Sequence, residues 1–202
     1  MNYLDPSEYV AFGLEETTPA ALVAAASSLM DAHCRRTTLG LSQYTERLRL
    51  VGRGTARVTY LPLNAEAGNA SPVAAIRVRY GVPRHGDIGA DAAQAFGLTG
   101  EWTQLDPSLV DVDQSTGEVT FPVHPLGLTY NEAELTYNAG WETLPAGVKC
   151  ACAQIVRNAQ ATPALNVRAN SIDQMRMEYF SDSLLNEDVR KLLAPYVAQK
   201  VG

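Results

Sequence analysis

The sequence predicts an α+β fold: a small bundle of α-helices with an antiparallel β-sheet or hairpin region and a β-hairpin insertion. Two long stretches have apolar residues at helical spacing, one near the N-terminus and one after Pro145. Between them, apolar and polar residues alternate along several short runs, as in strands with one buried face. The 202 residues suit one domain with elaborations, and the hydrophobic (46%) and charged (19%) fractions are ordinary for a globular protein.

The first helix is expected from Pro19 to about Arg36. Thr17 or Thr18 is a suitable N-cap, and Pro19 fits the first helical position, where its missing N–H would have no helical partner. One face of this helix is small and apolar, which allows a neighbouring helix to approach closely. That face comprises Leu22, Ala25, Ala26, Leu29, Met30 and His33.

Three strands are expected next, over residues 44–51, 55–63 and 73–80. In the first and third, apolar side chains alternate with arginines, so the arginines share the polar face of each strand. These arginines are Arg47, Arg49, Arg77 and Arg79. Two interpretations stay open: a solvated sheet face, or a basic surface that meets an acidic protein surface or a phosphate backbone.

The segment 81–129 is expected to be a loop-rich, acidic insertion. Residues 109–123 hold two alternating runs around a Gly-containing turn, which predicts a β-hairpin that carries Asp111, Asp113 and Glu118. Residues 81–146 have a formal charge of −9, against −6 for the whole chain. The acidic segment of a neighbouring copy is therefore a candidate partner for the basic strands.

Residues 135–161 are expected to form a strand, a turn that ends at Gly140, and a helix that begins at Pro145. Gly140 and Trp141 are predicted to fix the turn and pack the core, so that Trp141→Ala prevents folding. The buried face of the helix is predicted to contain Val148, Ala151, Cys152, Ile155, Val156 and Ala159.

Residues 164–202 are expected to be a C-terminal extension that is irregular or extended up to residue 175 and contains a final helix. Val189, Leu192 and Leu193 form the apolar stripe of this helix, and Pro195 ends or kinks it.

The sequence predicts no catalytic residue, metal site or cofactor site. His85 and Asp87 lack a third ligand at a usable spacing. Cys150 and Cys152 would point about 200° apart on a helix, so we expect buried thiols in a reducing compartment. We expect no secretory signal, because the first residues have neither a basic n-region nor an apolar h-region. We expect no membrane span, because no apolar run approaches the roughly 20 residues that a bilayer requires.

Several of these segments together resemble the head–tail connector (adaptor, or head-completion) proteins of tailed phages. The most similar stretch is the extended run 137–141 followed by residues 144–149, which open a helix. The close of the chain, residues 189–196, resembles the Leu-Leu-x-Pro-Tyr ending of that family, and 44–46 its first strand. The scaffold residues that carry the resemblance are Tyr137, Gly140, Trp141, Pro145, Val148, Leu193, Pro195 and Tyr196.

This resemblance implies one connector domain over 1–202, in which 81–129 departs from the family as a longer insertion. It implies a structural virion protein of the neck, present in the host cytoplasm during assembly, and not an enzyme. Such proteins form a ring, usually of twelve copies, beneath the portal protein. The ring extends the DNA channel, lets double-stranded DNA pass without sequence-specific binding, and presents a surface to a tail-completion, terminator or tail tube protein.

Three interpretations of function are weighed. The first is the connector; the second is a tail-completion or terminator protein of the same virion; the third is a small α+β enzyme or ligand-binding domain. The candidate interface between copies, or with a partner, consists of the four arginines together with Asp111, Asp113 and Glu118.

Overall fold

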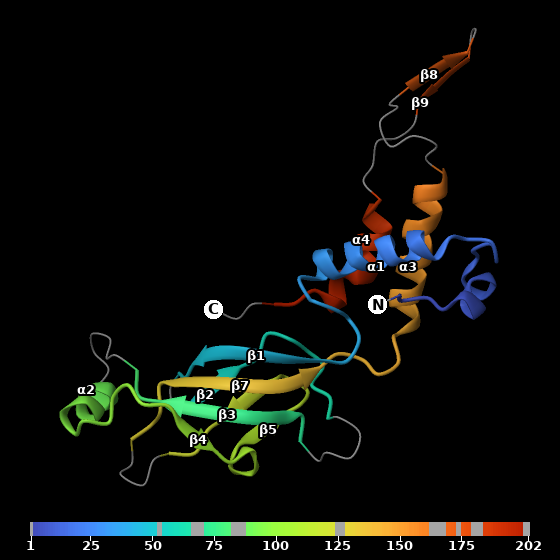
Figure 1. The fold of residues 1–202 in the computed structure, drawn as a ribbon. Coiled ribbons are helices and arrows are strands. Elements are labelled where there is room, and N and C mark those ends of the chain that lie inside the picture. Colours follow the sequence, from blue (N-terminus) through green and yellow to red (C-terminus); the bar gives the residue numbers. More distant parts are fainter. Residues whose placement is uncertain are drawn as a thin grey trace. The chain divides into compact units, whose positions relative to one another are not determined.

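The computed structural model contains helices and antiparallel sheets, which confirms the predicted α+β fold. The chain forms two compact units, which we call the helical unit (up to residue 39, with 143–197) and the sheet unit (40–142, with the end from 198) (Figure 1). Within the described residues, no helix is long and apolar enough to span a bilayer. The structure describes residues 2–51, 54–65, 71–81, 88–123, 128–161, 169–172, 175–178 and 184–199.

The helical unit is built on α3, which packs against both of the other helices, α1 and α4. Two antiparallel strands of this unit, β8 and β9, form a hairpin; β8 lies in the stretch predicted to be irregular or extended, and β9 begins at its end. Its elements are η1 (Pro6–Glu8), η2 (Val10–Phe12), α1 (Ala20–Cys34), α3 (Ala146–Ala161), β8 (Ala169–Ile172), β9 (Met175–Glu178), α4 (Glu187–Leu193) and η4 (Ala194–Tyr196).

Helix α1 buries a face that shares only Ala26 and Met30 with the predicted one. Its N-cap is Pro19, without a side-chain cap, and Ala25 of the predicted face is exposed. Polar Ser27 is buried instead, because its hydroxyl donates to the Val23 carbonyl at 2.8 Å and accepts from the Tyr3 N–H at 3.0 Å. The predicted face followed apolar residues alone and therefore left out Ser27. The observed buried face consists of Val23, Ala26, Ser27, Met30 and Cys34.

Helix α3 agrees closely with the prediction. Pro145 immediately precedes its first residue, and the Pro145 carbonyl accepts from the Val148 N–H at 3.0 Å. Of the predicted face, only Ala159 is not fully buried, and Ala153 joins it. The final helix, α4, also forms, and the side chain of Asn186 caps it by accepting from the Val189 N–H at 2.9 Å. Of its predicted apolar stripe, Val189 and Leu193 are buried, whereas Leu192 is exposed.

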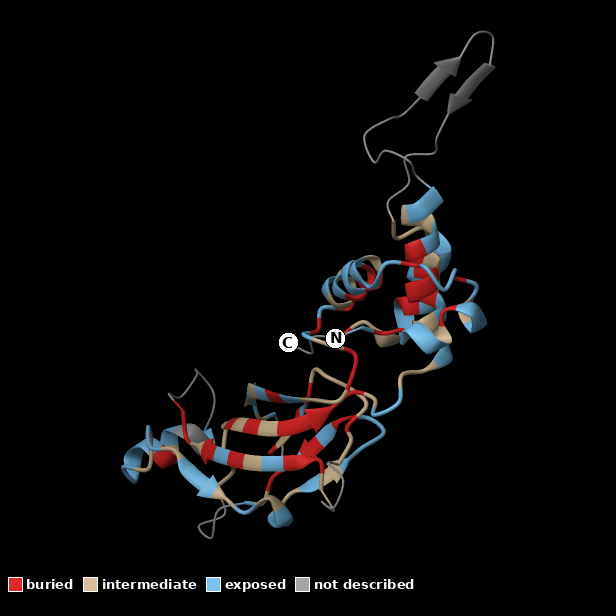
Figure 2. Ribbon diagram, turned by 45° about the vertical axis from the view of Figure 1, so that its right-hand side comes forward, coloured by how far each residue is buried: buried red, intermediate tan, exposed pale blue. Residues whose placement is uncertain are grey.

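The sheet unit consists of two antiparallel sheets. The four-stranded sheet has the order β1 (Ser42–Arg49), β7 (Glu132–Ala139), β3 (Val73–Arg79), β4 (Thr103–Leu105). The three-stranded sheet has the order β2 (Thr55–Arg57), β6 (Glu118–Thr120), β5 (Asp111–Asp113), so the predicted acidic hairpin is present as β5–β6. Exposed positions alternate with buried or intermediate ones along β1 and along most of β3, as the sequence predicted. Figure 2 shows this burial on the ribbon.

The core of the sheet unit is a single cluster to which both sheets contribute. Leu135 and Tyr137 of β7 are both 0% exposed, and Val119 of β6 reaches the same value from the other sheet. Tyr44 stacks on Tyr60 with ring centroids 4.0 Å apart. Each sheet therefore turns one face toward this shared core and the other face outward.

Two parts of the sheet unit differ from the prediction. The segment 81–129 is not only loops and a hairpin, because it also forms helix α2 (Ile88–Ala95) and edge strand β4. Frequent glycines in this segment indicate loops, but Gly89 lies in the first turn of α2. The predicted strand 55–63 is confined to 55–57, because Thr59 and Tyr60 donate to side chains, the Glu46 carboxylate and the Tyr137 hydroxyl.

Candidate functional site

The four predicted arginines lie on the outer face of the four-stranded sheet. Strand pairing places Arg47 and Arg77 on either side of Glu134, and Arg49 and Arg79 on either side of Glu132. The strand pattern therefore gathers the arginines as expected, although β1 and β3 are not neighbours and β7 lies between them.

The two β7 glutamates partly neutralise these arginines. Glu132 Oε2 accepts from Arg47 Nη2 at 2.6 Å and from Arg79 Nε at 2.7 Å, and Glu134 forms an ion pair with Arg77. Both glutamates belong to the acidic segment 81–146, so part of that segment already pairs with the arginines inside one chain. Pairing of the arginines with a neighbouring copy stays a prediction.

Trp102 completes this face, and the sequence analysis missed it. Its ring centroid lies 4.6 Å from the Arg79 guanidinium carbon, 5.6 Å from that of Arg47 and 5.7 Å from that of Arg77. All three distances are within the range of cation–π contact. The signal lay in the short alternation before Leu105, because pairing of Gln104 with Arg77 places Trp102 on the same outer face.

We call this surface the basic–aromatic face. It has two more positive than negative side chains, and it combines arginine with tryptophan, the residue types enriched at binding hot spots. It consists of Arg47, Arg49, Arg77, Arg79, Trp102, Glu132 and Glu134.

The charge of Glu132 is expected to stabilise the sheet unit. Burial raises the pKa of this carboxyl, but the hydrogen bonds and charges of Arg47 and Arg79 prevail, so the pKa is lower than usual. A lowered native pKa means that the stabilisation is present above the unfolded pKa of about 4.3 and is lost as the pH falls through the native pKa.

Glu132→Gln is therefore expected to lower the free energy of unfolding by about 1 kcal/mol at pH 7, and the difference should shrink toward zero on acidification. Urea unfolding of both proteins from pH 7 to pH 3 measures it. Glu142→Gln, at an exposed position, is the control and should show no such pH dependence. A loss that is the same at every pH would contradict the role of the charge.

The acidic side chains of the β5–β6 hairpin lie on the outer face of the three-stranded sheet. Asp111, Asp113 and Glu118 are exposed, whereas Val119 between them is buried in the core. Asp113 also holds the turn, since it accepts from the Ser115 N–H at 2.8 Å and the Ser115 hydroxyl at 2.6 Å. These bonds and those from Thr116 lower the pKa of Asp113 to about 2.

The scaffold residues lie in both units. Tyr137 is in the core of the sheet unit, whereas Val148 and Leu193 are fully buried in the helical unit.

Gly140 has a φ of 116° and its N–H donates to the Pro62 carbonyl at 3.0 Å. Trp141 is half-buried and is not part of the buried core, so the expected core-packing role belongs to Tyr137. Pro195 and Tyr196 form η4, after α4.

The remaining sequence candidates are the possible metal ligands and the cysteines, and the described residues form no metal-binding cluster. His85 and Asp87 lie outside the described residues. In the part of the chain that the structure describes, no three His, Cys, Asp or Glu side chains gather as metal ligands would. Cys150 is exposed, while burial raises the pKa of Cys34 and of Cys152 to about 11.

Comparisons of the chain with protein-family models and with curated protein sequences found no match.

Proposed function

We propose that this chain is a structural head–tail connector protein of a tailed phage, which assembles into a ring between the portal and the tail. The proposal rests first on the resemblance of the segments around Gly140 and Pro145. In the structure these segments join the two units, because β7 belongs to the sheet unit and α3 to the helical unit. The residues that carry the resemblance therefore connect the two units along the chain.

One observation of the structure carries the proposal furthest: the sheet unit has outer faces of opposite charge. The basic–aromatic face lies on one side of the shared core. The acidic hairpin, with Asp111 and Glu118, faces outward on the other side, where three carboxylates outweigh the guanidinium of Arg57 opposite Glu118. Copies with two different complementary faces associate head to tail, and such contacts close into a ring when the rotation between copies closes.

In this proposal, the acidic hairpin of one copy contacts the basic–aromatic face of the next. Trp102 lies at the centre of that contact, and the surrounding ion pairs exclude water from it. The net charge of −6 disfavours tight binding of the DNA that passes through the ring. The portal protein and a tail-completion, terminator or tail tube protein bind the two ends of the ring.

Electron microscopy of the purified chain, alone and mixed with the portal protein of the same virion, tests the proposal. We expect closed rings of about twelve copies, at least in the presence of the portal. Chains that stay monomeric and do not bind the portal at micromolar concentrations would contradict it. A matched sample of the portal alone controls for rings that the portal itself forms.

A further inference from the structure

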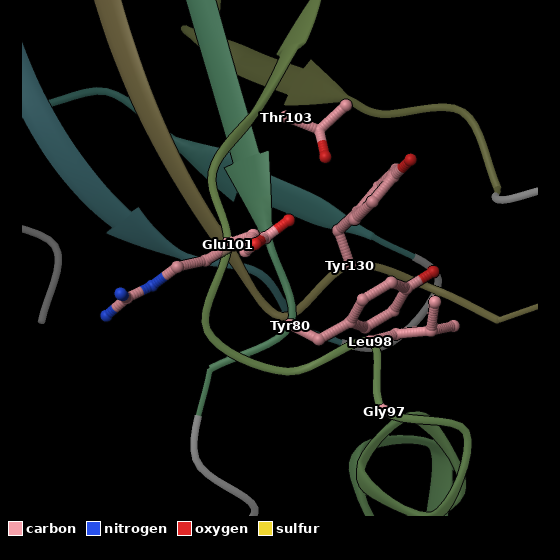
Figure 3. A pocket seen from close by; sticks show the side chains of 7 residues that line it. Tyr80, Gly97, Leu98, Glu101, Thr103 and Tyr130 are labelled. Carbon is pink, nitrogen blue, oxygen red and sulfur yellow. The ribbon is translucent and has the colours of Figure 1, made fainter.

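A small cavity in the sheet unit borders the basic–aromatic face, with which it shares Arg79. It has a volume of about 180 Å³, and residues of three separate segments line it: 79–80, 97–103 and 130. Small-molecule sites in proteins usually measure about 300–1,000 Å³, so this cavity suits a single side chain better than a cofactor. Figure 3 shows the rings of Tyr80 and Tyr130 and the side chain of Leu98 along its wall.

Two tyrosine rings and a carboxylate give the cavity its chemistry. The ring centroids of Tyr80 and Tyr130 are 5.0 Å apart and their planes are inclined by 31°. Glu101 lines the cavity together with Thr103 and Tyr130 (Figure 3). Within the described residues, Glu101 forms no ion pair and no hydrogen bond, so its charge is available to a ligand.

Among the described residues that line the cavity, the basic one is Arg79, and it does not cancel this charge. Arg79 donates from Nε to Glu132 at 2.7 Å, and its guanidinium lies 4.6 Å from the Trp102 ring centroid. Its charged end is therefore held by the basic–aromatic face. The cavity consequently presents a negative carboxylate and two electron-rich ring systems, a combination that attracts a cation and repels phosphate.

We propose that this cavity binds the side chain of an arginine from a partner protein. A guanidinium group stacks on tyrosine rings and donates paired hydrogen bonds to a carboxylate, which an ammonium group cannot do in the same geometry. The inference does not depend on the connector proposal, because it rests on the cavity and the residues around it.

An exposed aromatic residue beside the cavity supports a protein partner. Phe96 precedes lining residue Gly97 and is 69% exposed, and Ile88 at the other end of α2 is 81% exposed. Phenylalanine is among the aromatic residues enriched at protein interfaces, so Phe96 is a suitable contact for a partner protein. The partner segment therefore carries its arginine next to an apolar residue that contacts Phe96.

A titration of the full-length protein with N-acetyl-L-arginine amide, followed by NMR, tests the proposal. The ring signals of Tyr80 and Tyr130 and the backbone amide of Glu101 should shift saturably. N-acetyl-L-citrulline amide has nearly the same shape without the charge, and it should bind about tenfold more weakly.

Glu101→Gln should weaken binding of the arginine probe by about tenfold, while Glu142→Gln, at an exposed position outside the cavity lining, should leave it unchanged. The amide spectrum away from the cavity shows that each variant is folded. Equal binding of the citrulline probe, no effect of Glu101→Gln, or no saturable shift at all would overturn the proposal. Shifts of the same signals by inorganic phosphate would overturn it too, in favour of an anion site.

Discussion

Replacing Tyr137 by alanine is expected to lower the free energy of unfolding of the sheet unit by about 3–5 kcal/mol. The side chain is 0% exposed, and its ring centroid lies 6.2 Å from that of Tyr44 in the shared core. Its removal leaves a cavity that β7, the central partner of β1 and β3, cannot close. Urea unfolding followed by circular dichroism measures the loss.

The hydroxyl of Tyr137 is a separate part of this prediction. It accepts from the Tyr60 N–H at 3.2 Å, and burial together with the neighbouring Glu46 carboxylate raises its pKa far above the usual value. Tyr137→Phe keeps the ring and should cost only about 1–3 kcal/mol. If the alanine variant were no less stable than the phenylalanine variant, the ring would not be a core residue.

Gly140→Ala is expected to lower the free energy of unfolding by about 2 kcal/mol. The residue is buried at the end of β7, with a φ of 116° that side chains rarely allow. A shift of the backbone would break the hydrogen bond to the Pro62 carbonyl. Thermal and urea unfolding of the variant measure the effect.

Gly97→Ala is the matched control for Gly140. Its φ of 70° also favours glycine, but a Cβ there would meet nothing within 4 Å, so the expected loss is only about 1 kcal/mol. Equal losses at the two positions would mean that Gly140 is strained no more than an ordinary left-handed residue.

Local patterns in the sequence predicted the elements whose burial repeats regularly. The face of α3 and the alternation along β1 and β3 follow directly from apolar spacing. The buried face of helix α1 was only partly predicted, because Ser27 is buried through hydrogen bonds to Val23 and Tyr3. A polar residue gives no apolar signal in the sequence. Helix α2 was missed because glycines dominate its surroundings.

The candidate site was only partly predictable because its contacts are long-range. The polar faces of two strands indicated the arginines, but Glu132 lies 85 residues from Arg47 and 53 from Arg79 in the sequence. Only strand order places β7 between β1 and β3. The cavity around Glu101 depends on three separate segments, and no spacing along the chain indicates that they meet.

The most direct test of head-to-tail assembly uses two variants with opposite charge changes. One carries Arg49→Glu and Arg77→Glu on the basic–aromatic face, and the other carries Asp111→Lys and Glu118→Lys on the hairpin, which spares the turn residue Asp113. In each variant alone, both contact faces have the same sign, so assembly should be lost.

In an equimolar mixture, every contact between unlike copies again joins opposite charges, so rings of alternating copies should form. Mass photometry of each variant and of the mixture, with the portal present in all samples, measures this. If copies assemble head to tail through these two faces, rings should form from the wild type and from the mixture only. Rings from either variant alone, or none from a mixture of two folded variants whose wild type assembles, would contradict it.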